Sequence, residues 1–308
     1  MKKFNILVIG GTGFLGSNLV SALDREGHHI RVLSRGHIRQ EENHKNVEYI
    51  KGDINNNRDL DEAINGIDYV YHFASTTNPK SSESDLLFDV SSNLSAVIGT
   101  LNKCVKNDIK KFIFCSSGGT VYGNHNEMPI SEESPCAPIS SYGLVKYNIE
   151  MYIKYFNYKY NLNYEILRLS NPYGINQLTD GTHSIIPTYI KRILDNREIK
   201  VFGNGSVVRD YIYIDDFINL TLKLLTIREK NNTLNIGSGK GTSICELIHK
   251  IELLCGKKAL IQYLPERKFD VSKNYLDINK VRQVYRWKPK ISLDDGLKRT
   301  LNWIESIN

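Results

Sequence analysis

The first 170 residues alternate short apolar runs with helical stretches, and this alternation restricts the fold more than any other feature of the chain. Strands that alternate strictly with helices form parallel sheets covered by helices on both faces. The sequence therefore predicts an α/β fold. We predict strands over Asn5–Ile9, Ile30–Leu33, Val47–Ile50, Tyr69–Phe73, Lys111–Cys115 and Tyr164–Leu169, and helices over about 14–26, 58–65, 86–107 and 140–161.

The pattern loosens after about residue 171, where helices near 183–195, 215–227 and 243–255 are separated by loops that contain glycine and proline. We therefore predict one domain over 1–170 and a smaller C-terminal α/β lobe over 171–308. Two segments near 202–240, Phe202–Asp216 and Thr233–Gly241, are expected to return to the first domain and complete it.

Composition narrows the class of protein. Hydrophobic residues make up 41% of the 308 residues and charged residues 24%, as in globular proteins. No apolar run approaches the roughly 18–20 residues of a membrane helix, and the apolar N-terminal run is interpreted as a strand, not a signal peptide. Five scattered cysteines without CxxC spacing argue against a metal site and favour the cytoplasm. The net charge of +6 is spread along the chain, which argues against a nucleic-acid partner.

A glycine-rich turn follows the first strand and opens the first helix. Gly10 permits the tight turn, Gly13 the close approach of a pyrophosphate, and Gly16 close packing of the helix on the strand. The free N–H groups and the dipole of that helix favour an anion. The turn therefore predicts a Rossmann domain, a doubly wound parallel sheet that binds a dinucleotide.

The residues after the next strands leave the type of dinucleotide open. The second strand ends at Ser34 and Arg35, without the acidic residue that would bind the ribose 2′-hydroxyl of NAD. Arg35 would pair with a 2′-phosphate, as in NADP sites, or lie over the adenine. Asp53 ends the third strand beside the adenine edge, and residues His72–Ser75 would line the cofactor from the fourth strand.

Tyr142 and Lys146 have the i, i+4 spacing that places two side chains on one face of a helix. An ammonium near a phenol favours the phenolate and lowers the phenol pKa from its ordinary value of about 10. Such a phenolate can take the proton of a sugar hydroxyl while its carbon loses hydride. The pair therefore indicates a redox step at a sugar carbon.

Over essentially its whole length, the chain resembles the extended short-chain dehydrogenase/reductases. Within them it is similar to the NAD-dependent nucleotide-sugar epimerase/dehydratase group, which is typified by UDP-galactose 4-epimerase. The resemblance rests on Gly10–Gly16, Asp53, His72–Ala74, Ser116–Gly123, Tyr142 with Lys146, Leu167–Gly174 and Gly205–Asp216.

The resemblance implies roles for individual residues. Tyr142 looks like the acid/base and Lys146 like its ribose-holding partner. The implied cofactor-binding residues are Gly10, Gly13, Phe14, Leu15, Gly16, Arg35, Asp53, Ile54, Phe73, Ala74, Ser75, Ser116, Tyr142 and Lys146. The implied substrate-binding residues are Asn171, Arg209 and Arg267 for the diphosphate, Phe202 for the base, and Ile186 and Pro187 for the nucleotide floor. Two alternatives stay open: Phe202 as a core residue, and Arg209 as an ion-pair partner of Asp210.

One position departs from the group's pattern. A catalytic Ser or Thr usually lies four residues before the Tyr-Gly of the Ser116–Gly123 segment, and here that position is Gly118. Thr120, which shares a face with it in an extended segment, is the first substitute and Ser117 the second. The 4,6-dehydratases carry an acidic pair directly after that hydroxyl, and Gly119 and Thr120 replace it here, which argues against dehydration.

Three functions follow as hypotheses. The first is an NAD-dependent 4-epimerase that acts through a transient 4-keto sugar on a nucleotide sugar, typically a UDP-sugar of the glucose and galactose type. The second is an NAD(P)-dependent 4-ketoreductase or 4-dehydrogenase in the synthesis of activated sugars for polysaccharides. The third is a catalytically silent nucleotide-binding scaffold. Segments 76–80, 119–125 and 172–184 would select the sugar, and helices 86–107 and 140–161 match those that form a homodimer in this group.

Overall fold

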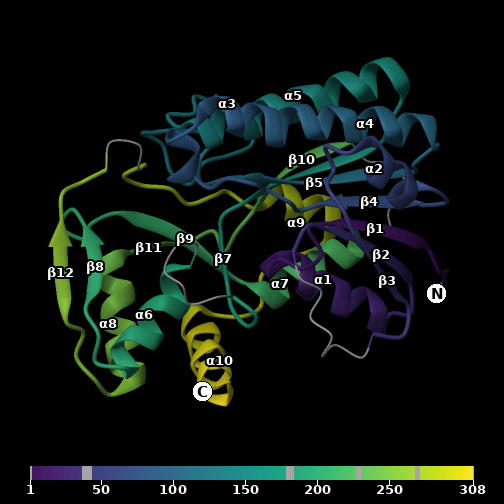
Figure 1. Ribbon diagram of the computed structural model, residues 1–308. Helices are drawn as coiled ribbons and strands as arrows, with labels where there is room; N and C mark the ends of the chain where they lie inside the picture. The colour runs from purple at the N-terminus through teal and green to yellow at the C-terminus, as the bar shows by residue number, and fades with distance from the viewer. Residues whose placement is uncertain (1, 37–43, 178–183, 227–230, 268–270, 308) are drawn as a thin grey trace. The chain divides into compact units, whose positions relative to one another are not determined.

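The computed structural model describes residues 2–36, 44–177, 184–226, 231–267 and 271–307 (Figure 1). A seven-stranded sheet has the strand order β10-β6-β5-β4-β1-β2-β3, and the pairs from β3 to β5 in this order are parallel. Its strands are β1 (Asn5–Ile9), β2 (His29–Ser34), β3 (Val47–Lys51), β4 (Tyr69–His72), β5 (Lys111–Ser117), β6 (Tyr164–Leu169) and β10 (Asn232–Ile236). The predicted α/β class and parallel sheet are confirmed.

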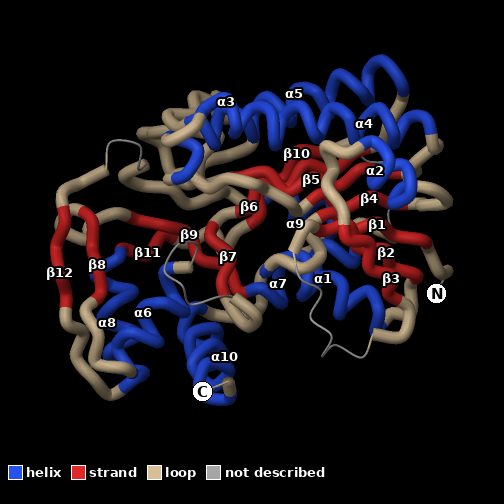
Figure 2. The backbone as a smooth tube through the Cα atoms, in the orientation of Figure 1, coloured by secondary structure: helices blue, strands red, loops and turns tan. Residues whose placement is uncertain are grey.

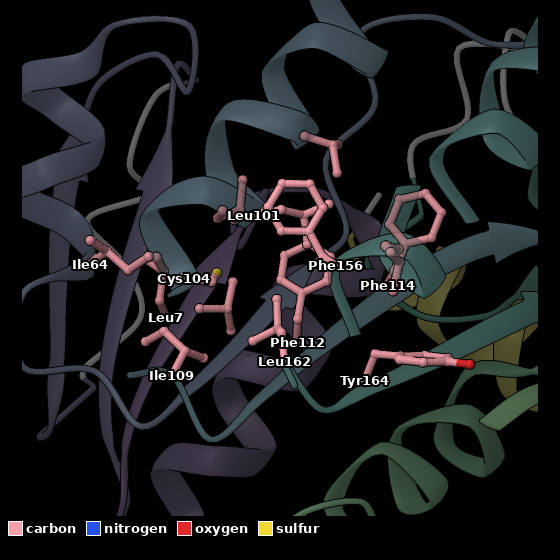
Figure 3. Close-up of a cluster of buried hydrophobic side chains, with 14 of the residues drawn as sticks. Leu7, Ile64, Leu101, Cys104, Ile109, Phe112, Phe114, Phe156, Leu162 and Tyr164 are labelled. Carbon is pink, nitrogen blue, oxygen red and sulfur yellow. The ribbon is translucent and has the colours of Figure 1, made fainter. Parts of the chain in front are cut away.

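Helices cover both faces of this sheet (Figure 1). One face carries α2 (Asn57–Ile64), α4 (Ala96–Lys106) and α5 (Ser141–Tyr160), and the other carries α1 (Phe14–Arg25) and α7 (Ile214–Lys223). Successive strand residues point to opposite faces. Thus Leu7 and Ile9 of β1 join a buried cluster with side chains of α2, α4 and α5, among them Leu101 and Phe156 (Figure 3).

By internal packing, the described residues form two compact units, which we call unit 1 and unit 2. Unit 1 comprises residues 1–117, 140–168 and 218–234, and unit 2 comprises 118–139, 169–217 and 235–308. Unit 2 contains a three-stranded sheet of β11, β9 and β7 and a two-stranded sheet of β12 and β8 (Figure 2). Its elements are β7 (Asn171–Tyr173), α6 (Ile185–Leu194), β8 (Ile199–Phe202), β9 (Val208–Tyr213), β11 (Gly241–Ser243), α8 (Ile244–Cys255), β12 (Ile261–Leu264), α9 (Asn279–Tyr285) and α10 (Leu293–Ser306).

These unit boundaries differ from the division predicted at residue 170. Residues 118–139 pack in unit 2, while 218–234 pack in unit 1. Of the two segments expected to return to the first domain, the one that starts at Thr233 contributes to β10 of the large sheet. Phe202–Asp216 instead lies wholly in unit 2, where β9 pairs with β7 and β11.

The predicted helix over 86–107 is interrupted. The chain forms α3 (Leu86–Asp89), a π-helical turn η2 (Val90–Ser95) and then α4. Such π-turns are rare and occur frequently at functional sites. The predicted helix ends at residues 183 and 227 lie outside the described residues, as do residues 178–183 of the predicted sugar-selecting segment. No helix in the described ranges has the length and apolar character needed to cross a bilayer.

Candidate active site

The glycine-rich turn adopts the geometry that its sequence predicts. Gly10 has a φ of +84°, and a Cβ there would lie 2.7 Å from the backbone nitrogen of Ala74. A Cβ on Gly16 would lie 2.2 Å from the Gly10 carbonyl oxygen. Both positions therefore require glycine, the first for backbone conformation and close approach and the second for helix packing.

Gly13 occupies a different environment at the start of α1. It is the N-cap residue, no side chain caps the helix, and the first turn holds no acidic residue. A Cβ on Gly13 would meet only the Gly10 carbonyl oxygen, 3.5 Å away. The space before the helix is thus open, and its backbone N–H groups can approach a ligand. This cradle fits the pyrophosphate of a dinucleotide.

The adenine side of the predicted site contains an ion pair. The Arg35 guanidinium lies 3.8 Å from the Asp53 carboxylate, and both side chains are partly exposed. The Ser34 hydroxyl is 2.5 Å from that of Thr12. The Asp53 carboxylate beside Arg35 opposes a second anion, so this arrangement favours NAD over the 2′-phosphate of NADP. Ile54, which follows Asp53, packs against the core of unit 1.

The segment after β4 lies against the glycine turn through Ala74. The Phe73 ring stacks edge-on against Tyr71, and the Ser75 hydroxyl donates to the Thr77 carbonyl at 2.9 Å. The His72 ring, which was expected to line the cofactor, is instead buried among Phe112 and Phe114. Burial and the charge of Lys146 lower the pKa of His72 to about 3, so the ring is neutral.

Tyr142 and Lys146 share one face of α5, as their spacing predicts. The Lys146 Nζ lies 5.6 Å from the centre of the Tyr142 ring and 4.8 Å from that of Phe114. It donates a hydrogen bond of 3.0 Å to the Cys115 carbonyl. Ser75 lies close enough to the Tyr142 phenol to lower its pKa. This pair therefore lies in unit 1 beside residues 73–77, the segment after β4 that we call the cofactor loop.

The expectation that Lys146 lowers the pKa of Tyr142 is wrong for this structure. Burial raises the pKa of Tyr142, and the charges of Cys115 and Asp89 raise it further, against the hydrogen bond to Ser75. Burial also lowers the pKa of Lys146. Desolvation disfavours the charged form of each group and is the largest effect on both pKa values.

The segment that departs from the family pattern is tightly held. Ser116 donates to Glu150 at 2.5 Å, and Glu150 also binds Arg168 at 2.7 Å, so the hydroxyl of Ser116 serves a buried network. The Gly118 carbonyl accepts from Asn274 at 2.9 Å. Ser117 is half-buried.

The Thr120 hydroxyl stands apart from these contacts. Its oxygen is buried and has no hydrogen-bond partner among the described residues. A buried hydroxyl without a partner is costly, so it is a candidate to bind a ligand. This favours Thr120 over Ser117 as the substitute hydroxyl.

The predicted diphosphate ligands lie in unit 2. Asn171 at the start of β7 donates to the Asp210 carbonyl at 3.1 Å, and Arg209 on the neighbouring strand donates to the Val208 carbonyl at 2.9 Å. The Asp210 carboxylate accepts from Ser238 at 2.6 and 2.7 Å. The backbone N–H groups of Gly239 and Leu276 also donate to it. Because backbone and hydroxyl donors fill this carboxylate, they explain its burial without an Arg209–Asp210 ion pair.

Phe202 and Arg267 come together in unit 2. The Arg267 guanidinium lies 4.1 Å from the centre of the Phe202 ring, a cation–π contact between β8 and the segment after β12. Phe202 is only partly buried, so it is not a core residue. Ile186 and Pro187, the predicted nucleotide floor, are buried in α6.

Sequence reasoning missed a group of polar side chains around the start of α5. Asp89 is wholly buried and binds Asn93, Thr77 and Ser141. The i, i+4 spacing of Asp89 and Asn93 was the available signal. The pattern predicts one regular helix over 86–107, and such a helix gives no reason to expect a buried polar pair.

Comparisons with known proteins agree with this architecture. Residues 6–237 match the model of the NAD dependent epimerase/dehydratase family. A putative UDP-glucose 4-epimerase of Methanocaldococcus jannaschii is 37% identical, with 98% of this chain and 99% of the relative covered. An Escherichia coli dTDP-4-dehydro-6-deoxyglucose reductase is 30% identical, with 98% of each covered. The UDP-glucose 4-epimerase of Thermotoga maritima, solved with UDP-glucose, has a TM-score of 0.93 and 34% identity over 98% of this chain and 99% of its own. The chain therefore belongs to the NAD-dependent epimerase/dehydratase family.

Proposed function

We propose that the protein is an NAD-dependent nucleotide-sugar 4-epimerase that acts on a UDP-sugar of the glucose and galactose type through a transient 4-keto sugar. The Tyr142–Lys146 pair beside the Ala74–Ser75 loop, in the unit that carries the open glycine cradle, supports this proposal most directly. UDP-glucose 4-epimerases among the relatives support the substrate class.

In the proposed reaction, the Tyr142 phenolate takes the proton of the sugar 4-hydroxyl while C4 loses hydride. A bound NAD would supply the acceptor for this hydride and its donor to the other face of C4, and the positive charge of the oxidised ring would favour the phenolate. Tyr142 then gives the proton back to the C4 oxygen, which forms the new 4-hydroxyl. No net oxidation results. Lys146, fixed by the Cys115 carbonyl, adds positive charge next to the phenol and would bond the cofactor ribose.

The nucleotide half of the substrate would be held by residues of unit 2. Arg209 and Arg267 would pair with the diphosphate, whose charged oxygens suit the guanidinium fork, and Asn171 would donate an amide N–H. Phe202 would stack on the base. Because these contacts hold only the base and the diphosphate, the sugar would be free to turn over between the two half-reactions.

The test combines cofactor release with conversion of a nucleotide sugar. We expect protein purified without added nucleotide to release NAD on denaturation and to interconvert UDP-glucose and UDP-galactose without consuming added cofactor. Binding of added NADPH, and its consumption by a 4-keto nucleotide sugar, would instead support the reductase, which the Escherichia coli relative favours. If neither dinucleotide binds, both enzyme functions are excluded.

Thr120 is proposed to supply the hydroxyl that Gly118 lacks. Thr120→Val keeps the side-chain shape and removes the hydroxyl. We expect kcat to fall about 10- to 100-fold, the effect of losing a hydrogen bond of about 1.5–3 kcal/mol to a charged group. Ser117→Ala, measured in the same assay, should keep most of the activity. Wild-type kcat in Thr120→Val together with a loss in Ser117→Ala would assign the role to Ser117.

We further propose that the protein forms a homodimer through α3, α4 and α5. We also propose that it lies in the cytoplasm and supplies activated sugars for polysaccharides. Apolar and aromatic side chains are exposed along these elements, to 82% at Leu87 and 87% at Tyr158. Others are Leu86, Phe88, Val90, Leu144, Met151, Tyr152, Tyr155 and Tyr160. Exposed apolar side chains in such number favour an interaction surface on these helices. Sedimentation equilibrium should give twice the chain mass of 35.2 kDa, and a monomer at micromolar concentration would contradict the dimer. Cell fractionation tests the location.

A further inference from the structure

Asp89, the last residue of α3, is the centre of a buried hydrogen-bond network in unit 1. Its Oδ1 accepts from the Thr77 hydroxyl at 2.6 Å and from the Asn93 amide at 3.0 Å. Its Oδ2 accepts from the Ser141 hydroxyl at 2.9 Å. The side chain is fully buried, and no Lys, Arg or His within the described ranges forms an ion pair with it. A buried carboxyl group held by neutral donors alone is costly and calls for a functional explanation.

The network joins the cofactor loop to the π-helical turn η2, which starts directly after Asp89. The Thr76 N–H donates to the Asn93 side-chain oxygen at 3.0 Å, and the Thr76 and Ser92 hydroxyls are 2.6 Å apart. Asn93 thus bonds both Asp89 and the loop. The wider π-turn places Ser92 and Asn93, which are adjacent in sequence, against the same loop.

The same network also holds the first turn of α5. Ser141, which bonds Asp89, directly precedes Tyr142. The Ser141 N–H donates to Glu83 at 2.7 Å and the Tyr142 N–H to Ser82 at 3.2 Å. Ser75 faces the Tyr142 phenol and lowers its pKa, and the Ser75 hydroxyl donates to the Thr77 carbonyl. Asp89 thus holds the residue before Tyr142 through the Ser141 hydroxyl. It also holds Thr77, whose carbonyl accepts from Ser75 beside the phenol.

We propose that Asp89 is a positioning residue for the Tyr142–Lys146 pair: it fixes the start of α5 through Ser141 and sets the charge balance of the pair. This inference rests on the proposed epimerase function. Asp89 would contact neither substrate nor cofactor and would act through Ser141, Thr77 and its buried charge.

The charge of Asp89 reaches both members of the pair. It raises the pKa of Tyr142 and also that of Lys146. The other groups that face Tyr142 are Cys115, which raises its pKa, and Ser75, which lowers it. Cys115 and Glu150 face Lys146 and raise its pKa against the effect of burial. Removal of the Asp89 charge should therefore move both pKa values down, and with them both limbs of the pH profile.

Asp89→Asn removes the charge and keeps the shape. We expect the profile of kcat against pH to move toward lower pH, because the negative charge that raises both pKa values is removed. We expect kcat at the optimum to fall about tenfold because Tyr142 is less well placed, with KM within about threefold. Ser141→Ala removes the hydrogen bond to Asp89 but keeps the Asp89 charge. It should therefore lower kcat without moving the pH profile. Ser141→Thr, which keeps the hydroxyl, should restore kcat.

Glu165→Gln is the matched control, because it removes another fully buried carboxyl group of unit 1, one that lies 3.9 Å from Lys111. Its profile should coincide with that of the wild type. An unmoved profile in Asp89→Asn, or an equal movement in Glu165→Gln, would overturn the charge role. Should Asp89→Asn fail to fold by circular dichroism, Ser141→Ala decides, and an unchanged kcat there would overturn the positioning role. If the wild type itself converts no nucleotide sugar, the proposed function fails, which is a separate result.

Discussion

Tyr142→Phe is expected to lower kcat for epimerisation by about 10²- to 10⁴-fold, the usual contribution of a positioned acid/base. Phenylalanine keeps the ring that lies 5.6 Å from the Lys146 Nζ and removes only the hydroxyl that exchanges the proton. The substrate would still bind, because the proposed nucleotide contacts come from Arg209, Arg267 and Asn171. The Kd for the UDP-sugar should therefore stay within about threefold, since no charged hydrogen bond to the ligand is lost.

The measurement pairs single-turnover conversion with calorimetric binding of the UDP-sugar. Tyr147→Phe is the matched control, because it removes a phenol one residue beyond Lys146 on the same helix. That variant should keep the wild-type kcat. If Tyr142→Phe loses less than about tenfold in kcat, the proton is carried by another group, and Thr120 would be the first to examine.

Gly13→Ala is expected to abolish tight NAD binding while leaving the fold intact. The added Cβ meets only the Gly10 carbonyl oxygen, at 3.5 Å, so unit 1 can accept it without movement. It would, however, lie where a pyrophosphate must approach the N–H groups of α1. Losing one or two hydrogen bonds to a charged group, each about 1.5–3 kcal/mol, weakens binding by roughly 10- to 10⁴-fold.

NAD content after purification and the Kd for added NAD give the readout, and thermal unfolding gives the state of the fold. Gly99→Ala is the control, since a Cβ at that position in α4 meets nothing within 4 Å. It should retain NAD and raise stability by about 0.5–1 kcal/mol through higher helix propensity. Retention of NAD by Gly13→Ala at the wild-type level would show that the cradle does not bind the pyrophosphate.

Local patterns in the sequence determined the sheet of unit 1 and the first elements of the site. The strands Asn5–Ile9 and Tyr164–Leu169 lie where their apolar runs predict, because a buried parallel strand needs a continuous apolar run. The glycine turn and the spacing of Tyr142 and Lys146 are equally local. Both depend on neighbouring residues alone, through the steric fit of one turn and the 3.6-residue period of one helix.

Only the tertiary structure decided which buried polar groups meet. Asp89 bonds Ser141 across 52 residues, and the Gly118 carbonyl bonds Asn274 across 156. The direction of the Tyr142 pKa was also decided there, because burial depends on what packs around the phenol, whereas the spacing to Lys146 concerns one helix face alone. Likewise, β8 pairs with β12, and β9 pairs with β7 and β11, all outside the large sheet, because strand partners depend on long-range packing. Periodicity fixes which face of an element is buried, while the partner on that face depends on the whole chain.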